Sequence, residues 1–299
     1  MNRFDEMQAF VGVVDAGSFV RGAEALGMSK PAVSRHVSAL ETRLGVRLLQ
    51  RTTRRLSLTA EGQQFYTRCR ALLDDMADAE GELTSKSREV GGLLRVNAPL
   101  TFGILHLAPL WAAFKSRYPN VALDVTLSDR VVDLVDEGYD LAIRIARLAD
   151  SALVSRRLAT TRMVLCASPK YLRKHGRPKH PADLAAHATI AYTYWASGDD
   201  WSFTGPDGEV TVQVKPWMHT NNGDSCRASA LAHHGIVMQP TFRVGDDLAA
   251  GTLVELLPQY RGVELGIYAV YPTRRHLAPR VRALIDFLAA HFATARWPQ

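Results

Sequence analysis

The chain has 299 residues, of which 47% are hydrophobic, 22% charged and 8% aromatic. This composition excludes disordered, collagen-like and disulfide-scaffold proteins, and the length predicts two or three globular domains. Lysines and arginines number 36 against 30 aspartates and glutamates, so the net charge is +6, which favours an anionic partner only slightly.

The three cysteines, Cys69, Cys166 and Cys226, are far apart in the sequence and odd in number, which argues against structural disulfides. Charged residues come before any apolar run at the amino terminus, so we expect no secretory signal. No stretch approaches the roughly 18 apolar residues of a membrane span. We therefore expect a soluble, cytoplasmic protein without a membrane partner.

The first 45 residues predict three helices. Phe4, Met7, Phe10, Val11 and Val14 recur at steps of three and four residues, which indicates one face of a helix that ends at Gly17. Ser18 can cap a second helix, and Ser29 can cap a third that has Pro31 in its first turn and ends at Gly45. Two short helices joined by a turn are typical of the helix-turn-helix, whose second helix enters the DNA major groove.

The third helix has two different sides. One is an apolar stripe, and the other presents polar residues, among them Lys30, Ser34, Arg35 and Ser38. Positive charge is densest around this helix, since residues 27–58 hold seven basic residues and one acidic residue. A small helical bundle with a solvated polar face is the alternative interpretation.

Residues 46–57 favour DNA binding further. Their leucines can be buried while Arg47, Arg51, Arg54 and Arg55 project, which predicts a short basic hairpin, or wing, that meets phosphates or the minor groove. Within it the candidate DNA-binding residues are Arg51, Thr52, Thr53, Arg54 and Arg55.

A seven-residue apolar repeat begins after Thr59, in a segment with seven acidic and four basic residues over 59–90. This repeat is typical of a coiled-coil seam, so we expect a long helix that forms a dimer. The predicted seam residues are Phe65, Cys69, Leu72, Met76 and Leu83. A long helix that packs only on its own domain is the alternative.

Residues 4–66, FDEMQAFVGVVDAGSFVRGAEALGMSKPAVSRHVSALETRLGVRLLQRTTRRLSLTAEGQQFY, closely resemble the amino-terminal domain of LysR-type transcriptional regulators. The resemblance places DNA-reading positions at Lys30, Pro31, Ser34 and Arg35, with the wing at 51–55. One departure is Gly22, where such proteins often carry alanine, and a glycine inside a helix costs about 1 kcal/mol relative to alanine.

The resemblance also implies the layout of the whole chain. We expect an all-α winged helix-turn-helix domain at 1–58 and a linker helix for dimerisation at 59–90. A two-lobed α/β effector domain, similar to periplasmic binding proteins, should follow at 91–299. Its first lobe would comprise about 91–164 and 267–299, and its second lobe about 165–266.

Alternating strand and helix patterns after residue 91 independently predict a parallel sheet covered by helices, with helices at 104–118 and 131–137. Ligands bind such sheets beyond the carboxyl ends of the strands. Thr101, Ser128 and Arg144 lie at such ends. A polar segment before a second helix adds Asn221 and Asn222, and His234 follows that helix.

These six residues are the predicted effector site, and each has a plainer alternative. Thr101, Ser128 and Asn222 could satisfy local backbone groups, Arg144 could form a salt bridge between the lobes, and the histidine could be a surface residue. Cys226 is more typical of a small buried residue than of a redox sensor.

No motif of an enzyme active site is present, and we expect neither a cofactor nor a metal ion. The predicted function is a homodimeric or homotetrameric regulator that binds a double-stranded DNA operator and responds to a small organic acid. RNA polymerase is a further candidate partner. The alternative is a regulator that needs no effector or that is switched by cysteine oxidation.

Overall fold

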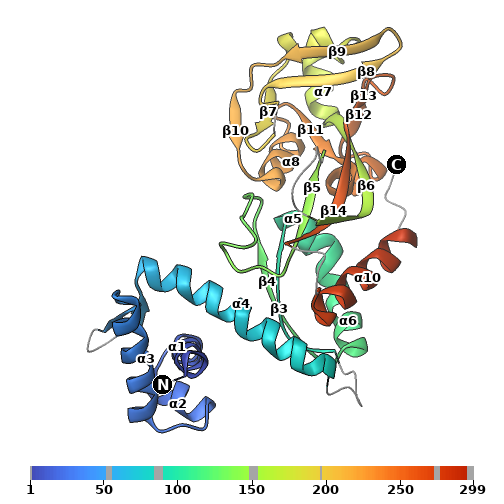
Figure 1. The fold of residues 1–299 in the computed structure, drawn as a ribbon. Helices are drawn as coiled ribbons and strands as arrows, with labels where there is room; N and C mark the ends of the chain where they lie inside the picture. The colour runs from blue at the N-terminus through green and yellow to red at the C-terminus, as the bar shows by residue number, and fades with distance from the viewer. Residues whose placement is uncertain are drawn as a thin grey trace. The chain divides into compact units, whose positions relative to one another are not determined.

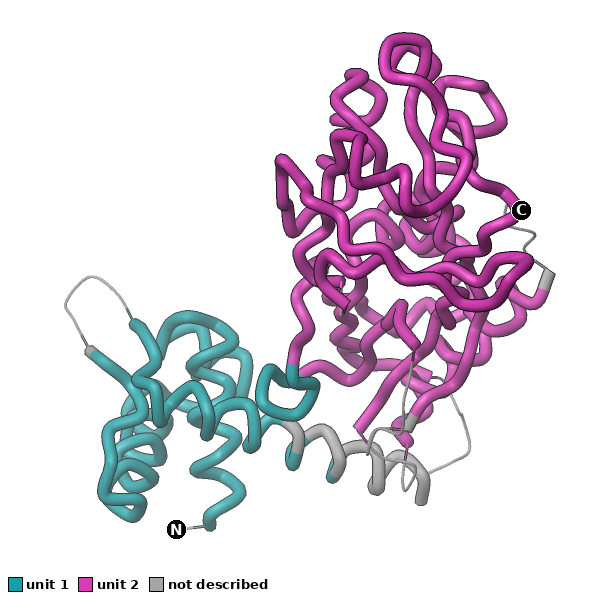
Figure 2. Tube along the Cα trace, turned by 90° about the horizontal axis from the view of Figure 1, so that it is seen from above, with its two compact units in different colours: residues 1–89, 133–138 teal, residues 90–132, 139–299 magenta. Residues whose placement is uncertain are grey.

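The computed structural model describes residues 2–51, 56–83, 90–147, 154–195, 197–272 and 277–294. The chain divides into two compact units (Figure 2). One comprises residues 1–89 with the segment 133–138, and the other comprises residues 90–132 and 139–299.

The first unit begins with the three predicted helices, α1 (Arg3–Ala16), α2 (Phe19–Ala25) and α3 (Lys30–Leu44) (Figure 1). The side chains of Ser18 and Ser29 cap α2 and α3 by accepting backbone N–H groups, as predicted. Gly17 and Gly45 end α1 and α3 in the left-handed conformation, with φ values of 63° and 71°. Each of these boundaries is therefore set by a single residue, through a serine hydroxyl at the start of a helix or a left-handed glycine at its end.

A short antiparallel hairpin follows, formed by β1 (Leu49–Arg51) and β2 (Leu56–Leu58). Helix α4 (Ala60–Leu83) comes next, and residues 84–89, the end of the predicted linker helix, lie outside the described residues. The first unit is therefore a winged helix-turn-helix followed by a long helix. Its core is formed by all four helices and the hairpin, and its buried residues are Ala9, Phe10, Val11, Val13, Ala23, Val33, Val37, Leu40, Leu48, Leu49, Tyr66 and Cys69.

Gly22 is required by the packing of α2 on α1. A Cβ atom at this position would lie 2.9 Å from the carbonyl oxygen of Gly12 and 2.9 Å from Cα of Val13. Both contacts are with backbone, which cannot move aside as a flexible side chain can. The helix-propensity cost expected from the sequence is therefore outweighed by the close approach that glycine allows.

We expect Gly22→Ala to destabilise the first unit by at least about 1 kcal/mol, although alanine is the better helix former, because overpacking strains the backbone. Urea unfolding followed by circular dichroism measures the change. Gly27→Ala in the following turn is a useful comparison, because Gly27 has φ of 63° and an added Cβ would meet no atom within 4 Å, so any loss there reports backbone conformation alone. A gain in stability for Gly22→Ala would contradict the packing argument.

The second unit has two lobes that share one sheet of nine strands. In the first lobe β3 (Gly91–Ala98) pairs in parallel with β4 (Asn120–Leu127) and β5 (Leu141–Ala146), and β14 (Glu264–Tyr271) runs antiparallel to β5. Its helical segments are α5 (Leu100–Phe102), the π-helix η1 (Gly103–Leu107), η2 (Ala108–Leu110), α6 (Trp111–Arg117) and α10 (Pro279–Thr294). The core between them includes Phe102, Phe114, Ile143, Ile267 and Leu284.

The second lobe continues the sheet with β10 (Met218–Thr220), β7 (Thr189–Tyr192), β11 (Ile236–Pro240) and β12 (Val254–Leu256). A separate sheet contains β8 (Asp200–Gly205), β9 (Gly208–Gln213) and β13 (Arg261–Gly262). Its helices are α7 (Pro169–His175), η3 (Pro181–Ala186), α8 (Gly223–Leu231) and α9 (Thr241–Ala249). Two apolar clusters fill this lobe, one around Trp201 and Met238 and the other around Cys226 and Val244.

Strand β6 (Val154–Ala167) joins the two lobes. Its first part pairs with β14 in the first lobe, and its last residues pair with β11 and β12 in the second. All three of these partners run antiparallel to β6, so the sheet as a whole is mixed. The predicted parallel pairing is confirmed for β3, β4 and β5 and does not extend to the strands around β6.

Two predicted helices differ in the structure. The segment 104–118 is helical, but it passes from π to 3₁₀ to α geometry at Gly103–Leu107, Ala108–Leu110 and Trp111–Arg117. The helix predicted at 131–137 is wrong, because this segment forms a turn. The Asp133 carboxylate accepts the N–H groups of Val135 and Asp136, both at 2.9 Å, and this local turn replaces the first helical hydrogen bonds.

Candidate functional site: a helix face and an interlobe cavity

Helix α3 presents the predicted DNA-binding residues to solvent. Lys30, Pro31, Arg35 and Ser38 are exposed and Ser34 is half-buried, whereas Val33, Val37 and Leu40 on the opposite side are buried in the core. The face is therefore accessible over its first two and a half turns, which is the part of a recognition helix that contacts base edges.

An ion pair with a buried carboxylate fixes α3 against α1. Nε and Nη2 of Arg43 donate to Oε2 of Glu6 at 2.9 and 2.8 Å, and Glu6 is only 4% exposed. The same carboxyl-terminal end of α3 is tied to the start of the hairpin, because Oε1 of Glu41 accepts the N–H groups of Leu48 and Leu49 at 2.9 and 3.0 Å. These contacts hold the exposed face of α3 and the start of the hairpin in one orientation.

The wing is described only in part. Arg51 ends β1, nothing is described of its side chain, and Thr52, Thr53, Arg54 and Arg55 lie outside the described residues. Their DNA contacts remain a prediction.

Helix α4 contributes to two different surfaces. Cys69 is fully buried in the core of the first unit and Phe65 packs against that core, so these two predicted seam residues stabilise their own domain. Leu72 and Met76 are 57% and 42% exposed and lie four residues apart on one face. The side chain of Leu83 is not described. Among the predicted seam residues whose side chains are described, only Leu72 and Met76 are therefore exposed.

The second unit contains a cavity of about 330 Å³ between its lobes, which we call the interlobe cavity. Its wall is largely aromatic and aliphatic and carries the polar residues Ser128, Asp129, Arg144, Gln239 and Arg243. The apolar lining is Pro99, Val131, Ile145, Ala146, Met163, Tyr192, Tyr194, Trp195, Trp201, Met238, Pro240, Phe242 and Leu265. The volume lies at the lower end of the range for small-molecule sites.

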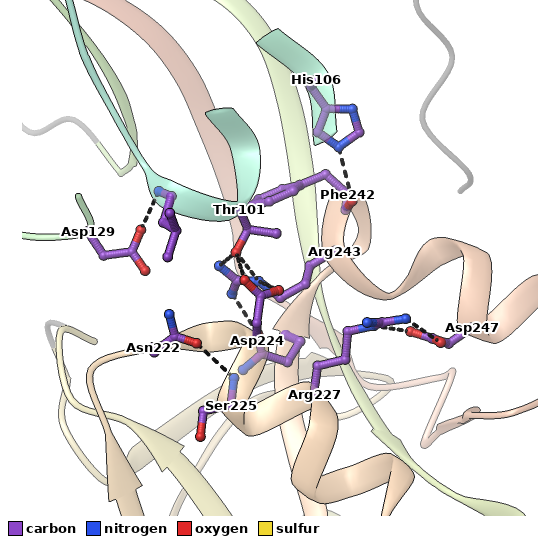
Figure 3. Close-up of polar contacts among 12 residues, drawn as sticks. Thr101, His106, Asp129, Asn222, Asp224, Ser225, Arg227, Phe242, Arg243 and Asp247 are labelled. Carbon is purple, nitrogen blue, oxygen red and sulfur yellow. Dashed lines mark hydrogen bonds and ion pairs between the residues drawn. The ribbon is translucent and has the colours of Figure 1, made fainter. Parts of the chain in front are cut away.

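Arg243 forms the polar centre of this region (Figure 3). Its Nε and Nη2 donate to Oγ1 of Thr101 at 3.2 and 3.0 Å, and its Nη1 donates to Oε1 of Gln239 at 2.7 Å. The Thr101 hydroxyl in turn donates to Oδ2 of Asp224 at 2.7 Å. Gly223 leaves room for the guanidinium, since a Cβ there would lie 1.9 Å from Nη1.

Two further charged groups of the wall come from the first lobe. Nη2 of Arg144 donates to the carbonyl oxygen of Val132 at 2.7 Å. Oδ1 of Asp129 accepts the N–H of Leu100 at 2.9 Å, which attaches the carboxylate to the start of α5. On the facing lobe, burial raises the pKa of the Tyr192 phenol above its ordinary value, and the Asp129 carboxylate raises it further. The Tyr192 hydroxyl is therefore protonated at neutral pH.

Family comparisons match both units. Residues 4–63 match the bacterial regulatory helix-turn-helix proteins of the lysR family, and residues 87–293 match the LysR substrate binding domain. The chain belongs to the LysR family of transcriptional regulators.

Several LysR-family members are similar over nearly their full length. The regulator CrgA of Neisseria meningitidis is 38% identical over 285 residues, which cover 95% of each chain. A CrgA structure superposes with a TM-score of 0.63 at 37% identity, covering 97% of this chain and 98% of that one. The Vibrio cholerae virulence activator AphB gives a TM-score of 0.60 at 28% identity, covering 97% and 99%.

Within this LysR-family fold, the predicted effector residues fall into different places. Ser128 and Arg144 line the interlobe cavity. Thr101 does not line it, but its hydroxyl holds Arg243, which does. Asn222 caps α8 by accepting the N–H of Ser225 at 2.8 Å. This contact is the alternative named in the sequence analysis, in which Asn222 satisfies a local backbone group.

Asn221 and His234 are not part of the cavity wall. Asn221 is exposed. His234 is also exposed, and it lies beyond the opposite end of α8, where its carbonyl oxygen accepts the indole N–H of Trp217 at 3.2 Å. A helix of nine residues separates this end from Asn222 by roughly 13 Å, so a direct contact of His234 with a ligand in this cavity is not supported.

Two polar residues of the cavity wall, Asp129 and Arg243, were not among the predicted effector residues, and only the first could have been recognised from the sequence. Asp129 follows Ser128 just after the end of β4 and could have been included on the same argument. Arg243 has no comparable signal, because its partner Thr101 is 142 residues away in the chain.

The described residues contain neither a membrane span nor a metal site. No helix among them is both long enough and apolar enough to cross a membrane. Within the same residues, no three histidine, cysteine, aspartate or glutamate side chains gather as a metal site would need.

Proposed function

We propose that this DNA-binding transcriptional regulator is cytoplasmic and responds to a small organic molecule bound in the interlobe cavity. The sequence leads us to expect an organic acid, and the guanidinium groups of Arg144 and Arg243 in the wall are consistent with one. The observation that carries the proposal is the cavity itself, whose wall is mostly apolar and includes a few polar residues.

The cavity also suggests how a ligand would act. Asp129 and Arg144 belong to the first lobe, whereas Tyr192 and Trp201 belong to the second, so one ligand would contact both. A ligand that binds one lobe arrangement more tightly than another shifts the population toward it. We propose that this shift is coupled to DNA binding or to activation, with RNA polymerase as the partner in the latter case.

The direct test is to map the DNA sites of the protein across its own genome and then to footprint one operator with the purified full-length chain. The genes beside the sites would name the metabolites to add. A footprint that changes its length or position with one of those metabolites would support the proposal. A protein that binds its operators identically with all of them would be the effector-independent regulator.

We propose that α4 forms the dimer through the face that carries Leu72 and Met76, because two large apolar side chains are exposed there. We expect Leu72→Glu with Met76→Glu to weaken the dimer by at least tenfold, since like charges would meet across a two-fold axis. Analytical ultracentrifugation measures the dissociation constant. Gln63→Glu and Gln64→Glu, at exposed sites earlier in α4, form the control, and an equal loss for the control pair would contradict this assignment.

A tetramer would need a second contact. Ile104 and Leu105 are 51% and 48% exposed and are adjacent on η1 of the second unit, so they form one apolar surface. We propose that a second copy covers them.

The cysteine-switched alternative is disfavoured by the state of the thiols. Burial raises the pKa of Cys226 to about 11, of Cys69 to about 11 and of Cys166 to about 12. The thiolate is the reactive form, so these cysteines should react slowly at neutral pH.

We expect iodoacetamide to label none of the three cysteines of the folded protein at pH 8 within an hour, and all three in urea. Mass spectrometry of tryptic peptides reads the labelling. Rapid modification of Cys226 in the folded protein, accompanied by a change in operator affinity after peroxide treatment, would favour the oxidation switch instead.

A further inference from the structure

Two ion pairs join α1 to α3 and to α4 in the first unit. Glu6, in the first turn of α1, pairs with Arg43 near the end of α3 at 2.8 Å. Asp15, in the last turn of α1, pairs with Arg70 of α4 at 2.6 Å. The recognition helix and the long helix are therefore both attached to α1, which is the element that relates one to the other.

The Asp15 carboxylate is held by two residues of α4. Nη1 of Arg70 donates to both of its oxygens at 2.6 Å, and the Tyr66 hydroxyl donates to Oδ1. Nη1 of Arg70 also donates to the Tyr66 hydroxyl at 2.9 Å, which closes the cluster. Tyr66 is only 8% exposed, and its ring meets that of Phe10 of α1 edge to face. The cluster therefore extends from the core to the surface between α1 and α4.

The position of Asp15 is not explained by its own helix. A carboxylate in the last turn lies near the negative end of the helix dipole, where it is unfavourable. The Asp15 side chain is also 38% exposed, and ion pairs of exposed groups contribute little to stability. Neither helix formation nor the stability of the domain accounts for an aspartate here, which leaves the placement of α4 as its role.

The cluster lies where α4 leaves the core. Among the described side chains of α4, Leu73 is the last that packs against the core, and Met76 beyond it is exposed. Helices α3 and α4 each pack on α1, so they are separated by up to two interhelical spacings, about 16–20 Å. A tilt of about 10° between α1 and α4 would then displace α3 by about 3 Å, which is close to the rise of one base pair.

We infer that Asp15 is a positioning residue that fixes the direction of α4 relative to the recognition helix, and so sets the half-site spacing that the dimer accepts. The inference rests on the proposed function, because it assumes that α4 forms the dimer. The recognition helices of a two-fold dimer contact half-sites at a separation that the protein fixes. With the cluster intact the dimer should select one spacing, and without it the two DNA-binding ends can tilt to fit several.

The test uses the full-length protein and its footprinted operator, with one or two base pairs inserted or removed between the half-sites. Fluorescence anisotropy measures the dissociation constant for each duplex and for random DNA. Asp15→Ala removes the acceptor of the ion pair, and Arg70→Met removes the donor but keeps a long side chain. Glu24→Ala, at an exposed acidic site of α2, removes the same charge as Asp15→Ala and is the matched control.

We expect the wild-type protein to lose about tenfold or more in affinity when one base pair is inserted or removed. Asp15→Ala should bind the original operator several-fold more weakly, but it should lose less than about threefold on the altered spacings, because its recognition helices can move to meet them. Arg70→Met should behave alike. The double variant should resemble either single variant, since both remove the same contact. Glu24→Ala should keep the wild-type selectivity.

The outcomes separate this inference from the proposed dimer. If Asp15→Ala stays dimeric in sedimentation and selects spacing as sharply as the wild type, the role of Asp15 is overturned and the α4 dimer stands. If Leu72→Glu with Met76→Glu leaves the dimer intact, both are overturned.

Three further results would count against the inference. Equal binding of the wild-type protein to all spacings would show that the dimer selects none. Additive losses of selectivity in the double variant would show that Asp15 and Arg70 act separately. An equal loss of affinity for every duplex, random DNA included, would show that the cluster only holds the domain together.

Discussion

Arg35→Ala is expected to reduce the preference of the protein for its operator over random DNA by about 1–3 kcal/mol. Arg35 is exposed on the second turn of α3. Val33 and Val37 are buried in the core, so the side of the helix that carries Arg35 faces solvent. An arginine at this place in a recognition helix can donate two hydrogen bonds to the edge of a guanine, and alanine cannot replace them. Fluorescence anisotropy with operator and scrambled duplexes measures both affinities.

Two other variants make the Arg35 result interpretable. Lys30→Ala should weaken binding to both duplexes alike and reduce the salt dependence by about one counterion, because a lysine at the helix start meets phosphate. Arg3→Ala removes an equal charge from an exposed site on α1 and should change little. Equal losses on operator and random DNA for Arg35→Ala would identify Arg35 as a phosphate contact only.

The sequence predicted those parts of the fold that depend on local chemistry. Ser18, Ser29, Gly17 and Gly45 set helix boundaries through their own side chains or backbone, so their pattern could be recognised directly. The helix predicted at 131–137 failed for an equally local reason, since a single aspartate forms a competing turn there.

Features that depend on distant neighbours were not predictable. From the sequence alone, Gly22 is expected to destabilise its helix. The reason for a glycine there becomes clear only from the close approach of the α1 backbone. Cys69 fits a heptad seam equally well whether its partner is a second copy or its own domain, and only packing decides between them. The binding site shows the same division, because strand ends indicated Ser128 and Arg144, whereas Arg243 depends on a contact across the lobes.

Thr101→Val is the second large effect that the structure predicts, and it concerns the second unit. The Thr101 hydroxyl makes all three of its hydrogen bonds, donating once to Asp224 and accepting twice from Arg243. Valine has the same shape and makes none of them. Because Arg243 is 8% exposed, its released N–H groups could not all turn to water. Hydrogen bonds to charged groups contribute about 1.5–3 kcal/mol each, and the losses are not additive. We therefore expect the free energy of unfolding of the second unit to fall by about 2–4 kcal/mol.

Thr101→Ser is the matched control, because it keeps the hydroxyl and loses one methyl group, and should cost about 1 kcal/mol. Urea unfolding monitored by tryptophan fluorescence is suitable, since all five tryptophans lie in the second part of the chain, after residue 110. The same variants test the role assigned to Thr101 at the cavity. If Thr101 acts by holding Arg243, Thr101→Val should weaken the binding of a cavity ligand, whereas Thr101→Ser should not. Equal stability of Val and wild type would show that the Thr101 hydroxyl does not hold Arg243 in solution.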